Sequence, residues 1–260
     1  MYKIFGSSET FAGDIDKVAP LSCILSNGNN YETYETSFGK GEKSLKIVCV
    51  SDTHSSQKNI KIPKCDLFIA AGDLINNTEG EKEIKLFNEW IEGIESKTKI
   101  IIAGNHDNYL EKNKSKIKEI FPSANYLENN SFQLKDSNIL IYGAPCILRR
   151  NFFIFGNAFS LSGEDMKKKW EQIPSNTDIL VTHVPPYDVL DLTYKNKHLG
   201  SKWLRNEICN RIHPKIHIFG HNHESVNKFA IGRFQNGEKC LFVNACALFT
   251  ERPCIIEYKY

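Results

Sequence analysis

The motif Gly104-Asn105-His106-Asp107 combines side chains that suit metal binding and proton transfer. Asn105 offers a neutral amide oxygen to a metal ion, and His106 offers a nitrogen that titrates near neutral pH. Asp107 could orient that imidazole or stabilise its charge. The motif follows residues 99–103, an isoleucine-rich run that is typical of a buried strand. A polar turn would explain the same residues, since Gly and Asn are favoured there, so the motif alone leaves both interpretations open.

Four further apolar runs also end in residues that can bind metal ions. These residues are Asp52 and His54 after 45–50, Asp73 after 66–71, His183 after 178–181, and His221 and His223 after 214–219. Each end has a simple explanation as a turn, but five in one chain do not fit five independent turns. Parallel strands of an α/β sheet bring their carboxyl ends to one edge, where ligands bind. Mixed nitrogen and oxygen ligands suit Mn, Fe or Zn better than Ca.

Local spacing supports convergence of these side chains on one site. Asp52 and His54 lie two residues apart, so extended backbone would point both to the same side. Gly72 permits a sharp exit from the strand before Asp73. Two prolines after Val184 stop the preceding strand and would hold His183 in place.

The spacing of apolar residues predicts the elements that position these strand ends. Helices are expected over residues 81–94, 110–120, 163–173 and 203–212, a strand pair over 131–134 and 138–142, and antiparallel strands over 227–231, 240–245 and 254–258. The first helix lies between two strands, which predicts a β-α-β unit. We therefore expect one α/β domain over residues 45–260. Residues 1–44 are expected to form a partly ordered extension packed on it, with a short hairpin as one arrangement.

Composition limits the class of protein. The chain has 260 residues, of which 41% are hydrophobic and 25% charged, as is ordinary for soluble globular proteins. A net charge of +2 argues against a nucleic-acid-binding surface. No run approaches the roughly 18 apolar residues of a membrane span, and the N-terminus does not resemble a signal peptide. The eight cysteines form no Cys-x-x-Cys pair, so we expect free thiols and a cytoplasmic location. The oligomeric state stays open.

Two arginines are candidates for contact with substrate. Arg149 and Arg150 follow a Gly-Ala-Pro turn and could border a pocket for a phosphorylated ligand. A surface loop explains them equally well.

In their order along the chain, the motifs closely resemble the calcineurin-like metallophosphoesterase superfamily. Its pattern is Asp-x-His, Gly-Asp, Gly-Asn-His-Asp/Glu, His and Gly-His-x-His, and every element occurs between residues 46 and 223. Residues 141–145, 177–186 and 214–220 also resemble the metallophosphoesterase-domain-containing branch, which is similar to cyclic-nucleotide phosphodiesterases. The resemblance implies a four-layer αββα sandwich, with two mixed β-sheets flanked by helices.

The resemblance also implies two divalent metal ions and a role for each motif residue. Asp52, His54 and His223 would bind one ion, Asn105, His183 and His221 the other, and Asp73 would bridge both. A hydroxide that bridges the ions would attack phosphorus, and His106 would protonate the leaving group, with Asp107 orienting His106. Some members of the branch have glycine at the position of His221. Because the histidine pair is intact here, we expect both ion sites to be filled.

The implied activity is hydrolysis of small phosphodiesters such as cyclic nucleotides. A phosphomonoester or phosphoprotein phosphatase on the same scaffold is the first alternative, and little chain remains to build a groove for a protein substrate. A metal-binding scaffold protein that recruits partners is the second. Degenerate members of that kind usually lose ligands or the catalytic histidine, whereas this chain keeps them all.

Overall fold

The computed structural model describes residues 22–25, 35–76, 78–149 and 156–260, and its strands form two large mixed sheets. The seven-stranded sheet contains, in spatial order, β1 (Ser22–Leu25), β13 (Lys228–Arg233), β14 (Lys239–Asn244), β12 (Ile216–Phe219), β11 (Ile179–Thr182), β8 (Leu140–Ala144) and β7 (Asn130–Gln133). The six-stranded sheet contains β2 (Glu35–Gly39), β15 (Cys254–Lys259), β3 (Ser44–Val50), β4 (Cys65–Ala71), β5 (Ser96–Ile102) and β6 (Asn125–Tyr126). A short parallel pair joins β9 (Ile147–Leu148) and β10 (Ser160–Leu161).

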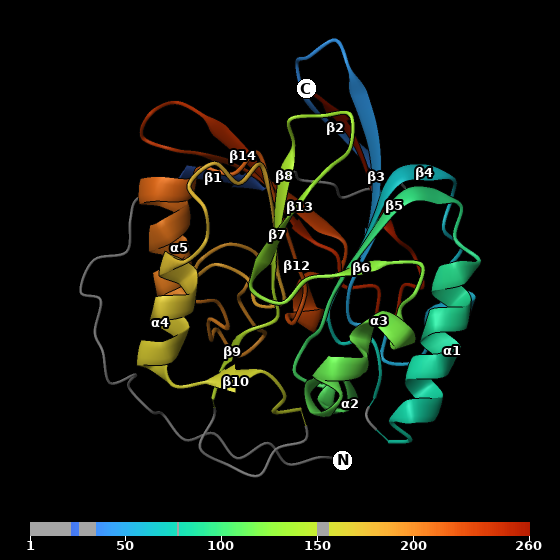
Figure 1. Cartoon of the computed structure of the whole chain (residues 1–260). Helices are drawn as coiled ribbons and strands as arrows, with labels where there is room; N and C mark the ends of the chain where they lie inside the picture. The colour runs from blue at the N-terminus through green and yellow to red at the C-terminus, as the bar shows by residue number, and fades with distance from the viewer. Residues whose placement is uncertain (1–21, 26–34, 77, 150–155) are drawn as a thin grey trace.

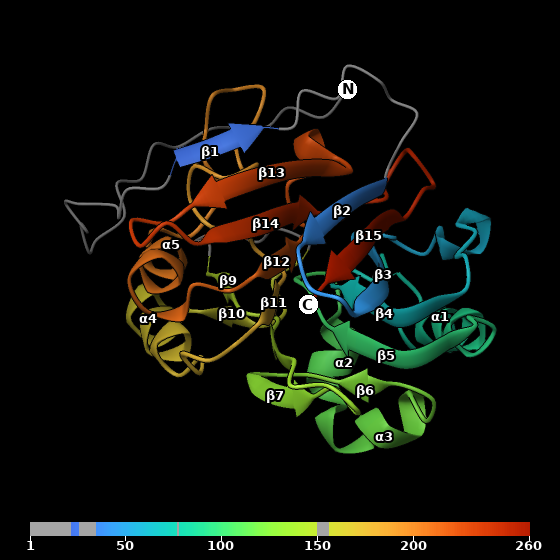
Figure 2. The ribbon, with the colours of Figure 1, turned by 90° about the horizontal axis from the view of Figure 1, so that it is seen from above.

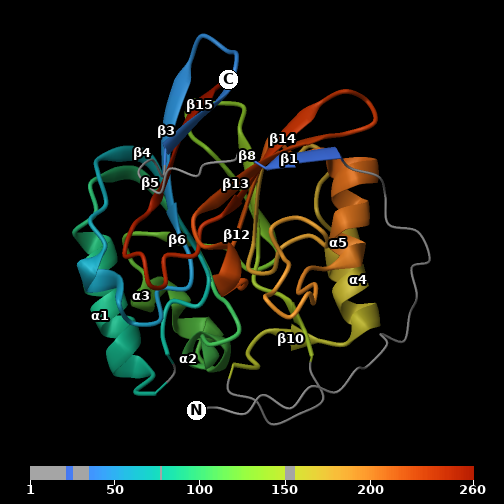
Figure 3. The ribbon, with the colours of Figure 1, turned by 180° about the vertical axis from the view of Figure 1, so that it is seen from behind.

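The helices cover the outer faces of the two sheets (Figure 1). Beside the six-stranded sheet lie α1 (Glu81–Glu92), α2 (Asn108–Lys112) and α3 (Ile117–Ile120), and beside the seven-stranded sheet lie α4 (Gly163–Glu171) and α5 (Lys202–Glu207). Views from above and from behind show the sheets between the two groups of helices (Figures 2 and 3). The predicted four-layer αββα sandwich is confirmed.

Three apolar clusters hold these layers together. Ile47 and Leu67 of the six-stranded sheet share one buried cluster with Ile141 and Val181 of the seven-stranded sheet. Because both faces of each sheet are covered, the central strands are apolar on both sides and read as continuous hydrophobic runs. In α1, the apolar residues recur at a spacing of three to four, and Phe87 is fully buried against the sheet.

The helix predicted over residues 110–120 is interrupted. The first helix ends at Lys112, a 3-10 turn covers Lys114–Lys116, and α3 follows. The side-chain amide of Asn113 donates to the carbonyl of Tyr109 at 2.9 Å and competes with continuation of the helix. The helix predicted over 203–212 begins as α5 and finishes as a π-helical turn, Ile208–Ile212.

The ends of the chain contribute to both sheets. The first strand pairs with β13 and the second with β15, so the described strands of the N-terminal segment do not form a hairpin with each other. Of the three strands predicted near the C-terminus, β13 and β14 are antiparallel partners, whereas β15 lies in the other sheet, antiparallel to β3. The strand pair β7 and β8 is antiparallel, as predicted.

Two composition-based expectations concern the whole chain. The seven cysteines whose side chains the structure describes are buried free thiols, as predicted. None of the helices in the described ranges combines the length and the apolar character that a membrane span requires.

Candidate metal centre

The predicted ligands follow parallel strands whose carboxyl ends meet between the two sheets. In the six-stranded sheet β3, β4 and β5 are parallel neighbours, and in the seven-stranded sheet β11 and β12 are. Ser51, directly after β3, donates its N–H to the carbonyl of Ala245, directly after β14, at 2.8 Å. This bond joins the edges of the two sheets and brings residues from both to one site.

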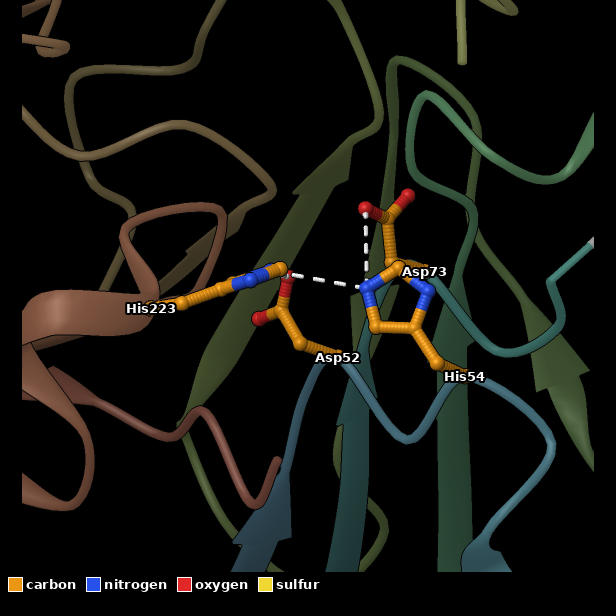
Figure 4. A group of neighbouring side chains, drawn as sticks. All are labelled: Asp52, His54, Asp73 and His223. Carbon is orange, nitrogen blue, oxygen red and sulfur yellow. Dashed lines mark hydrogen bonds and ion pairs between the residues drawn. The ribbon is translucent and has the colours of Figure 1, made fainter. Parts of the chain in front are cut away.

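The first cluster consists of Asp52, His54, Asp73 and His223, whose side chains point toward one another (Figure 4). The Nε2 atom of His223 lies 3.1 Å from Oδ1 of Asp52 and 3.4 Å from Nε2 of His54. Nε2 of His54 lies 3.8 Å from Oδ2 of Asp73. One atom from each residue lies within 4.8 Å of the others, so the group can surround a cation.

The second cluster consists of Asp73, His183 and His221, and it shares Asp73 with the first. Nε2 of His183 lies 3.4 Å from Oδ2 of Asp73. The amide oxygen of Asn105 lies 3.0 Å from Nε2 of His183 and 2.9 Å from Nδ1 of His221. The structure therefore brings together all seven residues that the sequence offered as metal ligands.

Hydrogen bonds between two loops fix the ligands that follow β3 and β4. The N–H of Asp52 donates to the carbonyl of Gly72 at 2.9 Å, and the N–H of His54 donates to that of Asp73 at 3.1 Å. The hydroxyl of Thr53 donates to the carbonyl of Leu74 at 2.9 Å. Thr53 stands between two ligands in the sequence, but the sequence did not predict its partner, because the two loops come together only in the folded structure.

Several ligands adopt a backbone conformation that is unusual for residues with a side chain. The φ angles of Asp52, His54, Asp73 and His221 are 52°, 42°, 51° and 64°. Left-handed backbone at non-glycine residues is disfavoured and persists where the surroundings impose it, often at functional sites. The extended geometry that the Asp-x-His spacing suggested is thus replaced by a tighter turn.

Glycines precede the ligands because no side chain fits beside them. A Cβ atom at Gly104 would lie closer than 3.0 Å to Asp73 Oδ1, and one at Gly220 would lie equally close to Asp52 Oδ2. Further along the chain, a Cβ atom at Gly156 would lie 2.7 Å from Nε2 of His106. No sequence motif marked Gly156 as part of the site.

Buried carboxylates and imidazoles shift the pKa values of one another. Burial disfavours the charged form of Asp52, but the hydrogen bond and charge of His223 outweigh it and lower the pKa of Asp52 to about 2. Burial also disfavours a charged His183, yet Asp73 raises the pKa of His183 to about 9. Burial lowers the pKa of His54. The two buried aspartates thus attract positive charge, and the nitrogen and oxygen donors around them fit a divalent cation.

The imidazole of His106 lies at the edge of the first cluster. Its ring centroid is 4.7 Å from that of His54, and its backbone N–H donates to Oδ1 of Asp73 at 2.8 Å. The side chain is half-buried. It is therefore placed beside the ligands and is accessible to a bound molecule.

Asp107 contacts backbone groups rather than the imidazole that we expected it to orient. Its carboxylate accepts hydrogen bonds from the N–H groups of Gly104, Leu74 and Ile75 at 2.7, 3.0 and 3.2 Å. Burial and the negative charge of Asp73 raise the pKa of Asp107 to about 8. Its geometry ties the loop after β5 to the loop after β4.

The predicted substrate-binding arginines lie outside both clusters or outside the described residues. Arg149 is exposed, and its guanidinium donates to the carbonyl of Ser160 at 3.4 Å. Arg150 lies outside the described residues. A role for the two arginines in substrate binding stays a prediction.

The fold and the convergent donors define an αββα protein with a candidate metal centre. A family model described as calcineurin-like phosphoesterase matches residues 45–225. The chain belongs to this family, which confirms the resemblance noted in the sequence.

Named relatives agree with this assignment, and one solved structure shares the fold. The chain is 35% identical over 210 residues to human metallophosphoesterase domain-containing protein 1, with 72% of this chain and 63% of that protein covered. It is 30% identical over 216 residues to UPF0046 protein K07C11.7 of Caenorhabditis elegans, with 77% and 71% covered. TT1561 of Thermus thermophilus shares the fold, with a TM-score of 0.53, 12% identity, and 78% of this chain and 90% of that chain covered. The chain spans less than two thirds of the human relative's length.

Proposed function

We propose that the protein is a metal-dependent phosphodiesterase that hydrolyses small diesters such as cyclic nucleotides. One observation carries the proposal: Asp73 belongs to both groups of ligand atoms. One carboxylate can give an oxygen to each of two ions only if the ions lie about 3.5–4 Å apart, which is the spacing of two-metal phosphoesterase sites. The family assignment supports the same class of reaction.

Each cluster is proposed to hold one divalent ion, Mn, Fe or Zn. Asp52, His54 and His223 would bind the first, Asn105, His183 and His221 the second, and Asp73 both. Bound ions would supply Lewis acidity and a hydroxide source near neutral pH. The two aspartates cancel only half of the four positive charges, so the site would attract an anionic phosphodiester.

His106 is proposed as the general acid. It lies beside both Asp73 and His54 and is half-buried, so a leaving alkoxide could reach its imidazole. Asp107 is proposed to position His106 indirectly. Its carboxylate fixes the turn at Gly104 that presents His106.

Substrate preference and metal content, measured on one sample, test the proposal. With Mn²⁺, the protein should hydrolyse bis-p-nitrophenyl phosphate faster than p-nitrophenyl phosphate. The reverse preference would establish a monoesterase. Metal binding without turnover of either ester would establish a scaffold protein, and no metal binding would overturn the metal centre itself.

A further inference from the structure

The strand that ends at His183 is supported by a buried histidine on the neighbouring strand. Leu180 of β11 lies directly beside His217 of β12. Thr182 follows two residues after Leu180, so its side chain lies on the same face of the sheet as that of His217. Both residues are fully buried, and Nε2 of His217 lies 2.8 Å from Oγ1 of Thr182.

The Thr182 hydroxyl spans the backbone of a proposed metal ligand. Its oxygen lies 2.6 Å from the carbonyl oxygen of Val184, so the bond connects the residues on either side of His183. A carbonyl oxygen can only accept, so the hydroxyl proton points to Val184. The hydroxyl oxygen must then accept from His217, which places a proton on Nε2 of that ring.

Hydrogen bonds also fix the backbone and the ring of His183. Its N–H donates to the carbonyl of Ala144 at 3.3 Å, and its carbonyl accepts from Gly220 at 3.0 Å. Nδ1 of its ring lies 3.0 Å from the carbonyl of Ala71, so Nδ1 carries a proton and Nε2 faces the second cluster. Partners of this kind orient ligands and tune metal affinity.

The buried ring of His217 lowers the stability of the fold, and its packing does not explain why a histidine stands at this position. Its Nδ1 atom is buried without a hydrogen-bond partner in the described part of the chain. The ring centroids of Phe219 and Phe242 lie 4.9 and 5.9 Å from the centroid of the His217 ring. An unpaired buried acceptor is destabilising, and an apolar ring would suit these neighbours better. Burial lowers the pKa of His217 to about 3, so the ring stays neutral.

We propose that His217 is a positioning residue that acts through Thr182 to hold His183 in its metal-binding orientation. The inference rests on the proposed function, since it assigns His183 to a metal ion. It predicts that the histidine serves ligand geometry at the expense of stability.

The test compares Mn²⁺ affinity and metal-free melting temperature across variants of the full chain. His217→Phe should weaken Mn²⁺ binding about tenfold, at the lower end of the effect of such supporting partners, while the melting temperature stays equal or rises. Thr182→Val, which removes the hydroxyl together with its bonds to His217 and Val184, should weaken binding at least as much. The double variant should bind Mn²⁺ no more weakly than Thr182→Val, because His217 acts only through that hydroxyl. His217→Gln keeps a donor near the Nε2 position and should restore most of the affinity.

Tyr142→Phe is the matched control. Leu180 of β11 has His217 of β12 as its neighbour on one side and Tyr142 of β8 as its neighbour on the other. The buried hydroxyl of Tyr142 also has no partner in the described structure. This variant should leave Mn²⁺ affinity unchanged. If His217→Phe and Thr182→Val bind Mn²⁺ as tightly as wild type, the inference is overturned and the proposed function stands. If the wild type binds no Mn²⁺, both fall.

Discussion

The first and second clusters share Asp73 but differ in charge and in exposure. The first contains two carboxylates, and the side chain of His223 is 36% exposed. The second contains one carboxylate, and the side chain of His183 is completely buried. The additional carboxylate of Asp52 favours a cation in the first cluster, whereas in the second a cation must compete with the proton that Asp73 stabilises on His183.

This difference suggests a division of labour between the clusters. The first cluster is exposed at His223 and has His106 beside His54, so we expect substrate to reach the site from this side. The sheets around the second cluster fix its His183, which is hydrogen-bonded to Ala71 of β4, Ala144 of β8 and Gly220, directly after β12. Variants that remove one ligand at a time test whether the clusters act as two separable ion sites.

The largest effect is expected for Asp73→Ala. Because this carboxylate belongs to both clusters, its loss should empty both proposed ion sites. Turnover should fall by at least roughly 10⁴-fold, since metal ions contribute several kcal/mol of transition-state stabilisation. Elemental analysis of the purified variant measures the metal content. Retention of one tightly bound ion would show that Asp73 serves a single cluster.

His221 and His223 offer a matched pair on one turn. His221→Gly should weaken only the ion in the second cluster, and His223→Ala only the ion in the first. Each should lower turnover by about 10³-fold, because one of two ions is lost. Metal titrations followed by stoichiometry would reveal one remaining site in each variant. Equal loss of both ions in either variant would mean that the clusters are not separable.

His106→Ala should separate chemistry from metal binding. Removing a general acid typically lowers turnover by about 10²–10⁴-fold, and we expect about 10²–10³ for a half-exposed imidazole. Metal content should stay near that of the wild type, because His106 belongs to neither ligand group. Kinetics and metal analysis on the same preparation check this. A variant that loses an ion would make His106 a ligand.

The sequence was most informative where a side chain follows a strand. Asp52, Asp73 and His183 could be placed together because parallel strands bring their carboxyl ends to one edge. The sequence could not predict contacts that form only when two loops meet in the fold. The clearest case is Asp107, whose carboxylate accepts from backbone N–H groups. Gly156, close to His106, had no signal in the sequence because it follows no predicted strand and no motif.

The helices show the same limit. Periodicity located α1 and α4 well, because each buries one apolar face against a sheet. It did not predict the interruption at Asn113, where a side-chain hydrogen bond to the backbone competes with the helix. Apolar spacing reports which face is buried, and it does not report such local competition.

The smallest predicted effect concerns pH and distinguishes protons from cations at the second cluster. Asp73 raises the pKa of His183 from 6.5 to about 9, so this ring contributes stability that is complete below pH 6.5 and is lost as pH rises toward 9. Asp107, with its pKa raised to about 8, lowers stability in the same direction up to about pH 8, because over this range the unfolded chain has already lost the proton that folded Asp107 retains. The lowered pKa of Asp52 affects stability only at acidic pH.

The melting temperature in a chelator should therefore fall between pH 6.5 and 9. Mn²⁺ binding should respond in the opposite way, because a cation must displace the proton of His183 and its affinity rises by up to about tenfold per pH unit for each proton displaced. The increase in melting temperature caused by Mn²⁺ should grow over the same interval. Replacing His183 with alanine should flatten this growth. His223→Ala should reduce the growth without removing it, because Asp52 also raises the pKa of His223 while the proton of His183 is still displaced in that variant. A Mn²⁺ effect that does not change with pH would mean that the second cluster binds no cation through His183.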